Sequence, residues 1–305
     1  MKKILVFCSL NFDNIYRVSH ITAAGETQAS TDMTIRLGGK GYNQAAATCK
    51  SGGAVWLAGC IGTDGKPFLD ACSKLGIHAE LVKTVPDCKT GHAVIQVSEE
   101  GENSILLFGG ANQRQDRAYI DHVLSKFDRG DYLMLQNEVN ELPYLIDRAY
   151  EIGMKIVLNP SPFNDIILKC DLDKVSWLLV NEIECRQILE ADCDEEPAEQ
   201  LRRKYPGCNI VVTLGKNGAR CWIDGQAISQ RAFSVTPVDT TGAGDCFTGY
   251  LIGMTAAGYS CQDALRTATA ASALCITRPG AAESVPTYAE VQAALRGSIE
   301  PTVRS

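Results

Sequence analysis

The sequence lacks several patterns that define familiar classes of protein. Its thirteen cysteines include no C-x-x-C pair and its four histidines have no ligand spacing, which argues against a zinc module or a disulfide framework. No G-x-G-x-x-G follows the first apolar run, which disfavours a dinucleotide-binding oxidoreductase. No run is long enough to span a bilayer, and no basic cluster offsets the net charge of −7. We therefore expect neither membranes nor nucleic acid as partners.

Cysteine usage and the first ten residues bear on the compartment. Most cysteines lie in apolar segments, as Cys60 does in Trp56–Ile61, where a free thiol behaves as a small buried side chain. Such usage predicts a reducing compartment, the cytoplasm. The start of the chain weakly resembles a signal sequence, but Asn11 and Asp13 interrupt it and no small-residue cleavage site follows. A first buried strand explains this segment better.

The order of apolar segments predicts an α/β fold. Strand-like runs, most of them ending in a polar or glycine-rich turn, alternate with helix-like segments from end to end. This alternation is typical of a doubly wound, mostly parallel sheet flanked by helices, and 305 residues suffice for one such domain. The predicted strands are Lys3–Cys8, Val55–Cys60, Tyr132–Leu135, Lys155–Leu158, Trp177–Val180 and Ile210–Thr213.

Two segments break this alternation. Residues 27–36 alternate polar and apolar side chains, and residues 93–108 have the pattern of a hairpin that turns at 98–103. We expect a small β-sheet lid, inserted into the single domain at about 14–37 and 91–109. Its apolar face would need cover from closure over a substrate or from a partner subunit. An ordinary antiparallel extension of the main sheet has the same pattern.

The most informative motif is D-T-T-G-A-G-D at Asp239–Asp245, between the strand-like run Ala232–Thr236 and the helix-like run Cys246–Thr255. Backbone N–H groups at a helix start lack intrahelical partners, so the turn at 242–244 is suited to bind phosphate oxygens. A bound phosphate would repel a carboxylate, so Asp245 is best explained as a base that deprotonates an attacking hydroxyl. Taken alone, the motif is also explained by a glycine turn whose aspartate complements the helix dipole.

Two motifs in the first half of the chain suit a sugar. Asn11 and Asp13 follow the first strand and offer an amide and a carboxylate to hydroxyls. Gly38–Ala46 is a glycine turn opening a helix without P-loop spacing, which favours a neutral polyol over a triphosphate. Gly109–Asn112 follows the predicted hairpin as a hinge or a contact. Asn and Asp are also common in ordinary turns.

Two further motifs suit a nucleotide. Asn181 and Glu184 would share one face of a helix and offer oxygen ligands to hydrated magnesium, although a helix cap has the same residues. Thr213–Gly218 is a strand followed by a glycine turn, on which phosphates or a ribose could rest. Each motif alone is explained by ordinary structure, but their joint occurrence in this order is not.

In this order the motifs resemble those of the ribokinases and, more broadly, of the phosphofructokinase-B-type, ribokinase-like carbohydrate kinases. The resemblance covers essentially the whole chain. It implies a doubly wound domain with a β-sheet lid that clasps the lid of a second subunit, and hence a homodimer. It also implies transfer of the γ-phosphoryl group of magnesium ATP to a primary hydroxyl of a free sugar.

The resemblance assigns roles to positions of this sequence. Asp245 is implied as the catalytic base, with Gly242, Ala243 and Gly244 as the anion hole. Glu184 is implied to act on magnesium. The residues implied to bind the sugar are Asn11, Asp13, Gly39, Lys40, Asn43, Glu138 and Asp245. The residues implied to bind ATP are Asn181, Thr213, Leu214, Gly215, Lys216, Asn217, Gly218, Gly244 and Thr269.

The family also implies a monovalent cation, K⁺, held mainly by backbone carbonyls beside the anion hole. The run Thr277–Ala281 resembles the loop that holds it, although a plain Pro-Gly turn between two helices has the same sequence. A fixed cation would draw the loop into register and add positive potential under the developing charge. The matching positions are Asp239, Thr241, Cys275, Arg278, Gly280 and Ser284.

The sequence leaves several acceptors open. Phe12 and Tyr42 are aromatic where the family often has small residues, which would narrow the pocket or stack on a base. A sugar phosphate would require arginines, but the predicted sugar site offers only Lys40, so we expect a neutral pentose, D-ribose first, giving ribose 5-phosphate. The alternative acceptors are a nucleoside, 2-deoxyribose, fructose and 2-keto-3-deoxygluconate. A non-catalytic sugar or nucleotide sensor is the alternative from another class, and an intact Asp245 argues against it.

Overall fold

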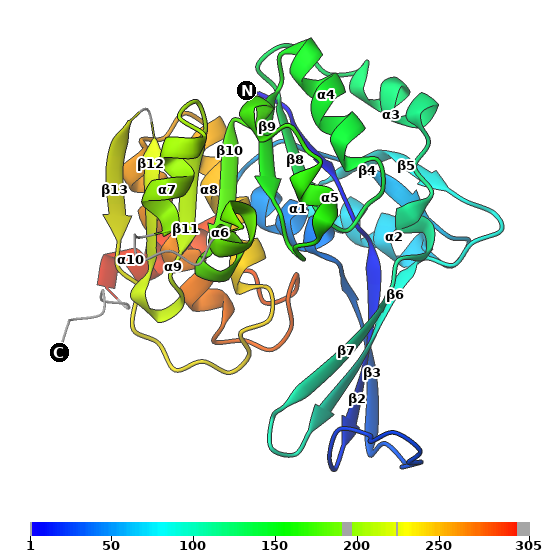
Figure 1. Cartoon of the computed structure of the whole chain (residues 1–305). Coiled ribbons are helices and arrows are strands. Elements are labelled where there is room, and N and C mark those ends of the chain that lie inside the picture. The colour runs from blue at the N-terminus through cyan, green and yellow to red at the C-terminus, as the bar shows by residue number, and fades with distance from the viewer. Residues whose placement is uncertain (1, 191–196, 224, 298–305) are drawn as a thin grey trace.

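The large sheet is the core of the structure, a computed structural model that describes residues 2–190, 197–223 and 225–297. In these residues eight of its nine strands run in one direction, and only β12, next to the edge strand β13, runs the other way (Figure 1). Every residue of the interior strand β1 is fully buried, as expected for a strand covered on both faces. In spatial order the strands are β13 (Gln226–Gln230), β12 (Ala219–Ile223), β11 (Asn209–Thr213), β10 (Trp177–Asn181), β9 (Lys155–Asn159), β8 (Tyr132–Gln136), β1 (Ile4–Phe7), β4 (Val55–Ile61) and β5 (His78–Thr84).

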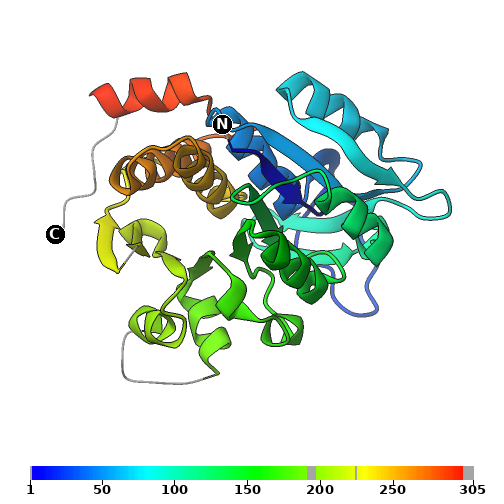
Figure 2. The ribbon, with the colours of Figure 1, turned by 90° about the horizontal axis from the view of Figure 1, so that it is seen from above.

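Helices cover both faces of this sheet and enclose two apolar clusters (Figure 2). In the described ranges no helix has both the length and the apolar character needed to cross a bilayer. The helices on one face are α1 (Lys40–Lys50), α2 (Lys66–Leu75), α8 (Ala243–Ala256), α9 (Cys261–Cys275) and α10 (Tyr288–Gly297). Those on the other face are α3 (Arg117–Leu124), α4 (Leu142–Ile152), α5 (Asp165–Leu168), α6 (Glu182–Leu189) and α7 (Pro197–Lys204). Short 3₁₀ helices are η1 (Gly110–Gln113), η2 (Leu172–Lys174) and η3 (Gly215–Asn217).

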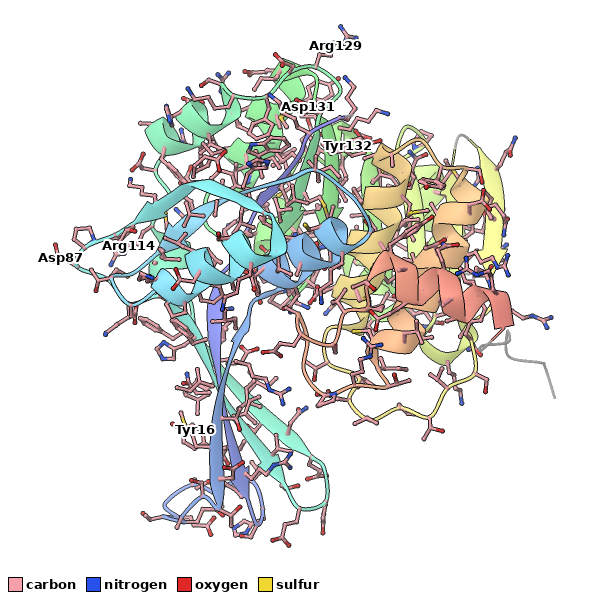
Figure 3. The ribbon with its side chains drawn as sticks, turned by 180° about the vertical axis from the view of Figure 1, so that it is seen from behind. Tyr16, Asp87, Arg114, Arg129, Asp131 and Tyr132 are labelled. Atoms are coloured by element: carbon pink, nitrogen blue, oxygen red, sulfur yellow. The ribbon has the colours of Figure 1, made fainter. Side chains whose placement is uncertain are left out.

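A second, small sheet extends away from this body (Figure 1). Tyr16 projects from it, whereas Arg129, Asp131 and Tyr132 lie at the opposite end of the molecule (Figure 3). Strand β2 is central and pairs antiparallel with β3 and parallel with β6. The division into one domain with inserted lid segments stays a prediction. The strands of the small sheet, in spatial order, are β3 (Asp32–Gly38), β2 (Asn11–Val18), β6 (Gly91–Ser98) and β7 (Asn103–Phe108).

The fold class is confirmed, and all six predicted strands are present within one residue of their predicted bounds. An ordinary turn, the alternative explanation for Asn11 and Asp13, does not apply, because these residues begin β2. The strand expected at Ala232–Thr236 is also wrong. Phe233 is buried there and makes only an isolated bridge, so the alternation reflects an extended segment packed on helices rather than a sheet strand.

Candidate active site

Asp245 lies in the first turn of α8 and is held by two amides of α1. Its side chain is 7% exposed. Asn43 Nδ2 donates to Asp245 Oδ2 over 3.1 Å, and Gln44 Nε2 donates to Asp245 Oδ1 over 2.9 Å. These bonds orient the carboxylate and leave each oxygen with a free lone pair for an incoming proton. The predicted site omits Gln44, although Gln44 lies within the Gly38–Ala46 motif.

Close packing of α1 on α8 makes these bonds possible. Gly249 lies one helical turn after Asp245, where a Cβ atom would be 2.5 Å from Ala47 Cβ and 2.6 Å from Gln44 O. Any side chain at Gly249 would therefore push the helices apart. The absence of a Cβ here brings the amides of α1 to the carboxylate of α8.

The predicted anion hole lies at the start of α8. Gly242 occupies the N-cap position with φ of 74°, and no side chain caps the helix. Ala243 N–H donates to Thr240 O over 3.3 Å, so the following amides are the ones left for a ligand. A cavity of about 170 Å³ joins this turn to Asn181, Glu184 and Thr213.

Lys40 and Glu138 lie beside Asp245. The Glu138 carboxylate accepts hydrogen bonds from Lys40 N over 2.9 Å and from Ser9 Oγ. Burial raises the pKa of Glu138. Burial alone would lower the pKa of Lys40, but the carboxylates of Asp245, Glu138 and Glu184 raise it. The lysine is therefore a fixed positive charge between the sugar and nucleotide residues.

Three polar groups in the predicted sugar site lack protein partners. Burial raises the pKa of Asp13 to about 7, with help from Glu138 and Glu283, and no described residue donates a hydrogen bond to its carboxylate. Asn43 Oδ1 is buried without a partner in the described chain. The Asn11 amide nitrogen likewise donates to no described residue. Two acceptors and one donor at one place complement the hydroxyls of a polyol.

Arg36 corrects the expectation that Lys40 is the only cation near the sugar site. Arg36 on β3 is the register partner of Asp13 on β2, and its charge lowers the pKa of Asp13 against the effect of burial. A Cβ at Gly280 would be 2.6 Å from Arg36 Nη1 and 2.5 Å from Glu283 Oε2. The arginine thus lies where the small sheet meets the 278–284 loop, which sequence spacing does not reveal.

The aromatic residues Phe12 and Tyr42 pack on Phe68. The ring centroids of Phe12 and Phe68 are 5.1 Å apart, and those of Tyr42 and Phe68 are 5.2 Å apart in an edge-on arrangement. Tyr42 is only 3% exposed. Tyr42 therefore supports the wall of the site rather than offering a face for stacking.

The predicted nucleotide residues divide into two groups. Asn181 caps α6, and Glu184 accepts from Asn181 N over 3.0 Å, which completes a capping box. Both also line the cavity with Thr213. Thr269 is buried in α9 and donates to Leu265 O over 2.8 Å. Thr269 and residues 214–218 are not among the residues lining the cavity, so their contact with a nucleotide stays a prediction.

The predicted cation residues lie at the end of α9, in the case of Cys275, and on two loops that are joined by hydrogen bonds. Asp239 accepts from Thr241 N and from Gly280 N, each over 2.9 Å. Cys275 Sγ lies 2.9 Å from Ser284 Oγ. The Arg278 side chain points instead to Glu290, at 2.7 Å, so Arg278 can serve this site only through its backbone.

Comparison with known proteins places this site in a family. The model of the pfkB family of carbohydrate kinases matches residues 1–288. The chain belongs to this family. The ribokinase of Haemophilus influenzae is 32% identical over 297 residues, covering 95% of the chain and 97% of that protein. The ribokinase of Bacillus subtilis is 31% identical over 296 residues, covering 96% of the chain and 99% of that protein.

Solved structures of family members have the same fold. The ribokinase of Cryptococcus neoformans, in complex with ADP, superposes with a TM-score of 0.83 at 34% identity, covering 96% of this chain and 99% of that one. The ribokinase of Arabidopsis thaliana, complexed with ribose and ATP, gives 0.85 at 27% identity, covering 97% and 99%. The likeness therefore includes both the body and the small sheet.

Proposed function

We propose that the protein transfers the γ-phosphoryl group of ATP to the primary hydroxyl of D-ribose. One observation carries the choice of a polyol: three polar groups without protein partners, the Asp13 carboxylate, Asn43 Oδ1 and Asn11 Nδ2, lie near the oriented carboxylate of Asp245. The relatives named ribokinase, which match nearly full length, support ribose among polyols.

Asp245 would take the proton of the hydroxyl as that oxygen attacks the γ-phosphorus. The bond from this phosphorus to the bridging oxygen breaks, and ADP leaves with the electron pair. The free amides at the start of α8 would stabilise charge on the transferring group. Lys40 would add a positive charge between the two substrates.

Two cations fit the residues present. Glu184, with Asn181 beside it at the cavity, would hold hydrated Mg²⁺ bound to the nucleotide phosphates, and such a cation neutralises charge on the phosphoryl group. No cluster of three His, Cys, Asp or Glu side chains suited to a metal occurs among the described residues, so the phosphates would supply the remaining ligands. Carbonyl oxygens and the Ser284 hydroxyl, on loops joined by Asp239, are donors of the kind K⁺ prefers.

The small sheet supports a homodimer. Its two edge strands, β3 and β7, carry large apolar side chains that are between 41% and 71% exposed. Unpaired, apolar strand edges favour pairing with another chain. A second small sheet would cover them. These side chains are Met33, Ile35, Ile105, Leu106, Leu107 and Phe108. We also place the protein in the cytoplasm, which the buried free thiols of Cys8 and Cys60 support.

A coupled assay of ADP release tests the function directly. Pentoses, hexoses and nucleosides would be compared with ATP, in the presence of K⁺ and then of Na⁺. We expect ribose to give the highest kcat/KM and K⁺ to stimulate. ADP release that no sugar or nucleoside stimulates would refute the proposal.

A further inference from the structure

Asn112 lies where the small sheet joins the body. Its side-chain amide forms hydrogen bonds there to residues that are distant in the sequence. Asn112 belongs to η1, directly after β7, and is 1% exposed. Its partners are Asn11, the first residue of β2, and Leu10, which precedes it. Two of the four strands of the small sheet therefore start in contact with this one amide, because β2 starts at Asn11 and β6 starts at Gly91 beside it.

The orientation of the Asn112 amide follows from its partners. Leu10 N–H donates to Asn112 over 2.9 Å, and since a backbone N–H can only donate, the atom facing it must be Oδ1. The nitrogen of Asn112 then faces Asn11 and donates to Asn11 Oδ1 over 2.7 Å. This leaves Asn11 Nδ2, a donor, as the polar atom with no partner in the described chain.

Gly91 leaves room for this hydrogen bond. A Cβ atom at Gly91 would overlap both Asn11 Oδ1 and Asn112 Nδ2. Ala111 N also donates to Lys89 O over 2.9 Å, which holds η1 against the segment leading into β6. The hydrogen bond between Asn11 and Asn112 therefore requires a residue without a side chain at position 91.

We propose that Asn112 is a positioning residue for the acceptor: it fixes the Asn11 amide so that its N–H group, rather than its carbonyl, faces the sugar. The inference rests on the proposed function. Because Asp13 and Asn43 offer acceptors, a donor at Asn11 would bind a sugar oxygen whose own proton is engaged elsewhere, or a ring oxygen. If the Asn11 amide were reversed, its carbonyl oxygen would face that sugar oxygen, and two acceptors would repel each other.

The test is Asn112→Asp. The new carboxylate still accepts from Leu10 N but can only accept from Asn11, so the Asn11 amide must reverse. We expect KM for ribose to rise about tenfold or more, the loss that follows from one lost hydrogen bond and one repulsive contact. Both kcat and KM for ATP should stay within about threefold. Calorimetric titration with ribose should show the same loss of affinity.

Two further variants make the result specific. Asn11→Asp presents an acceptor to the sugar while residue 112 stays asparagine, so the KM of this variant for ribose should rise similarly. Asn140→Asp is the matched control, since Asn140 pairs with the Gln115 backbone over 2.8 and 3.1 Å, outside the predicted sugar site. Its KM for ribose should not change.

The outcomes separate this inference from the proposed function. Wild-type protein without ribose kinase activity refutes the function, and the inference with it. Active wild type with an unchanged KM in folded Asn112→Asp refutes the inference alone, as does an equal rise in KM for ATP. If Asn112→Asp does not fold, Gly91→Ala, which displaces the same bond, must raise KM for ribose; an unchanged KM there refutes the inference.

Discussion

Replacing Asp13 by asparagine removes a buried carboxylate that no described residue stabilises by a hydrogen bond. Its pKa is raised by burial from 3.8 to about 7 in the folded state. At about 1.4 kcal/mol per pKa unit, the ionised group destabilises the folded protein by up to about 4 kcal/mol. Solvent and the nearby Arg36 screen this charge, so we expect Asp13→Asn to raise the free energy of unfolding by about 2 kcal/mol at pH 8.

The sign of the pH dependence follows from a folded pKa above the unfolded one. The destabilisation is absent below pH 3.8, grows between pH 3.8 and about 7, and is complete above that. The stability difference between Asp13→Asn and wild type should therefore shrink as the pH falls from 8 to 4. Urea unfolding followed by circular dichroism at pH 4, 6 and 8 measures it. The same variant should lose at least about tenfold in ribose affinity, because an ionised acceptor is gone.

Asp131→Asn is the control with the opposite expected sign. Asp131 accepts from Lys3 N over 3.1 Å and from Asp128 N over 3.0 Å, at the end of the body far from the small sheet (Figure 3). An asparagine can replace only one of these acceptors, so stability should fall by about 1–3 kcal/mol. If Asp13→Asn is no more stable than wild type at pH 8, or if its gain does not depend on pH, the account of Asp13 is wrong.

Three more predictions concern the reaction. Asp245→Asn should lower kcat by roughly 10²–10⁴-fold while ATP affinity, measured by titration, is largely kept; near-normal turnover would contradict its role as base. Gly249→Ala should separate α1 from α8, lower stability by about 1–3 kcal/mol and lower kcat, whereas Gly207→Ala, at a position where a Cβ meets nothing, should change neither. Arg36→Gln should raise the pKa of Asp13 further and move the acid limb of kcat/KM for ribose to higher pH, whereas Arg36→Lys should keep the wild-type profile.

Local sequence patterns predict those parts of the structure that depend only on neighbouring residues. Apolar runs mark the parallel strands, because a strand buried on both faces must be apolar throughout. The glycine turn before Asp245 and the capping pair Asn181 and Glu184 are encoded within a few residues each, so their structures are predictable. Edge strands such as β5 and β13 are half exposed and lack this continuous apolar signal, and they are not among the predicted strands.

Contacts between distant residues were decided only by the tertiary structure. Asn43 and Gln44 reach Asp245 across about two hundred residues because Gly249 lets two helices pack closely. Asn112 orients Asn11 because the small sheet leaves the body at that point, and Arg36 reaches Asp13 through strand register. Helix packing and register depend on the whole core, so no local spacing encodes them. The sequence by itself determines the fold class and the acid at the start of α8, while the tertiary structure decides which amides and charges surround that acid and the sugar.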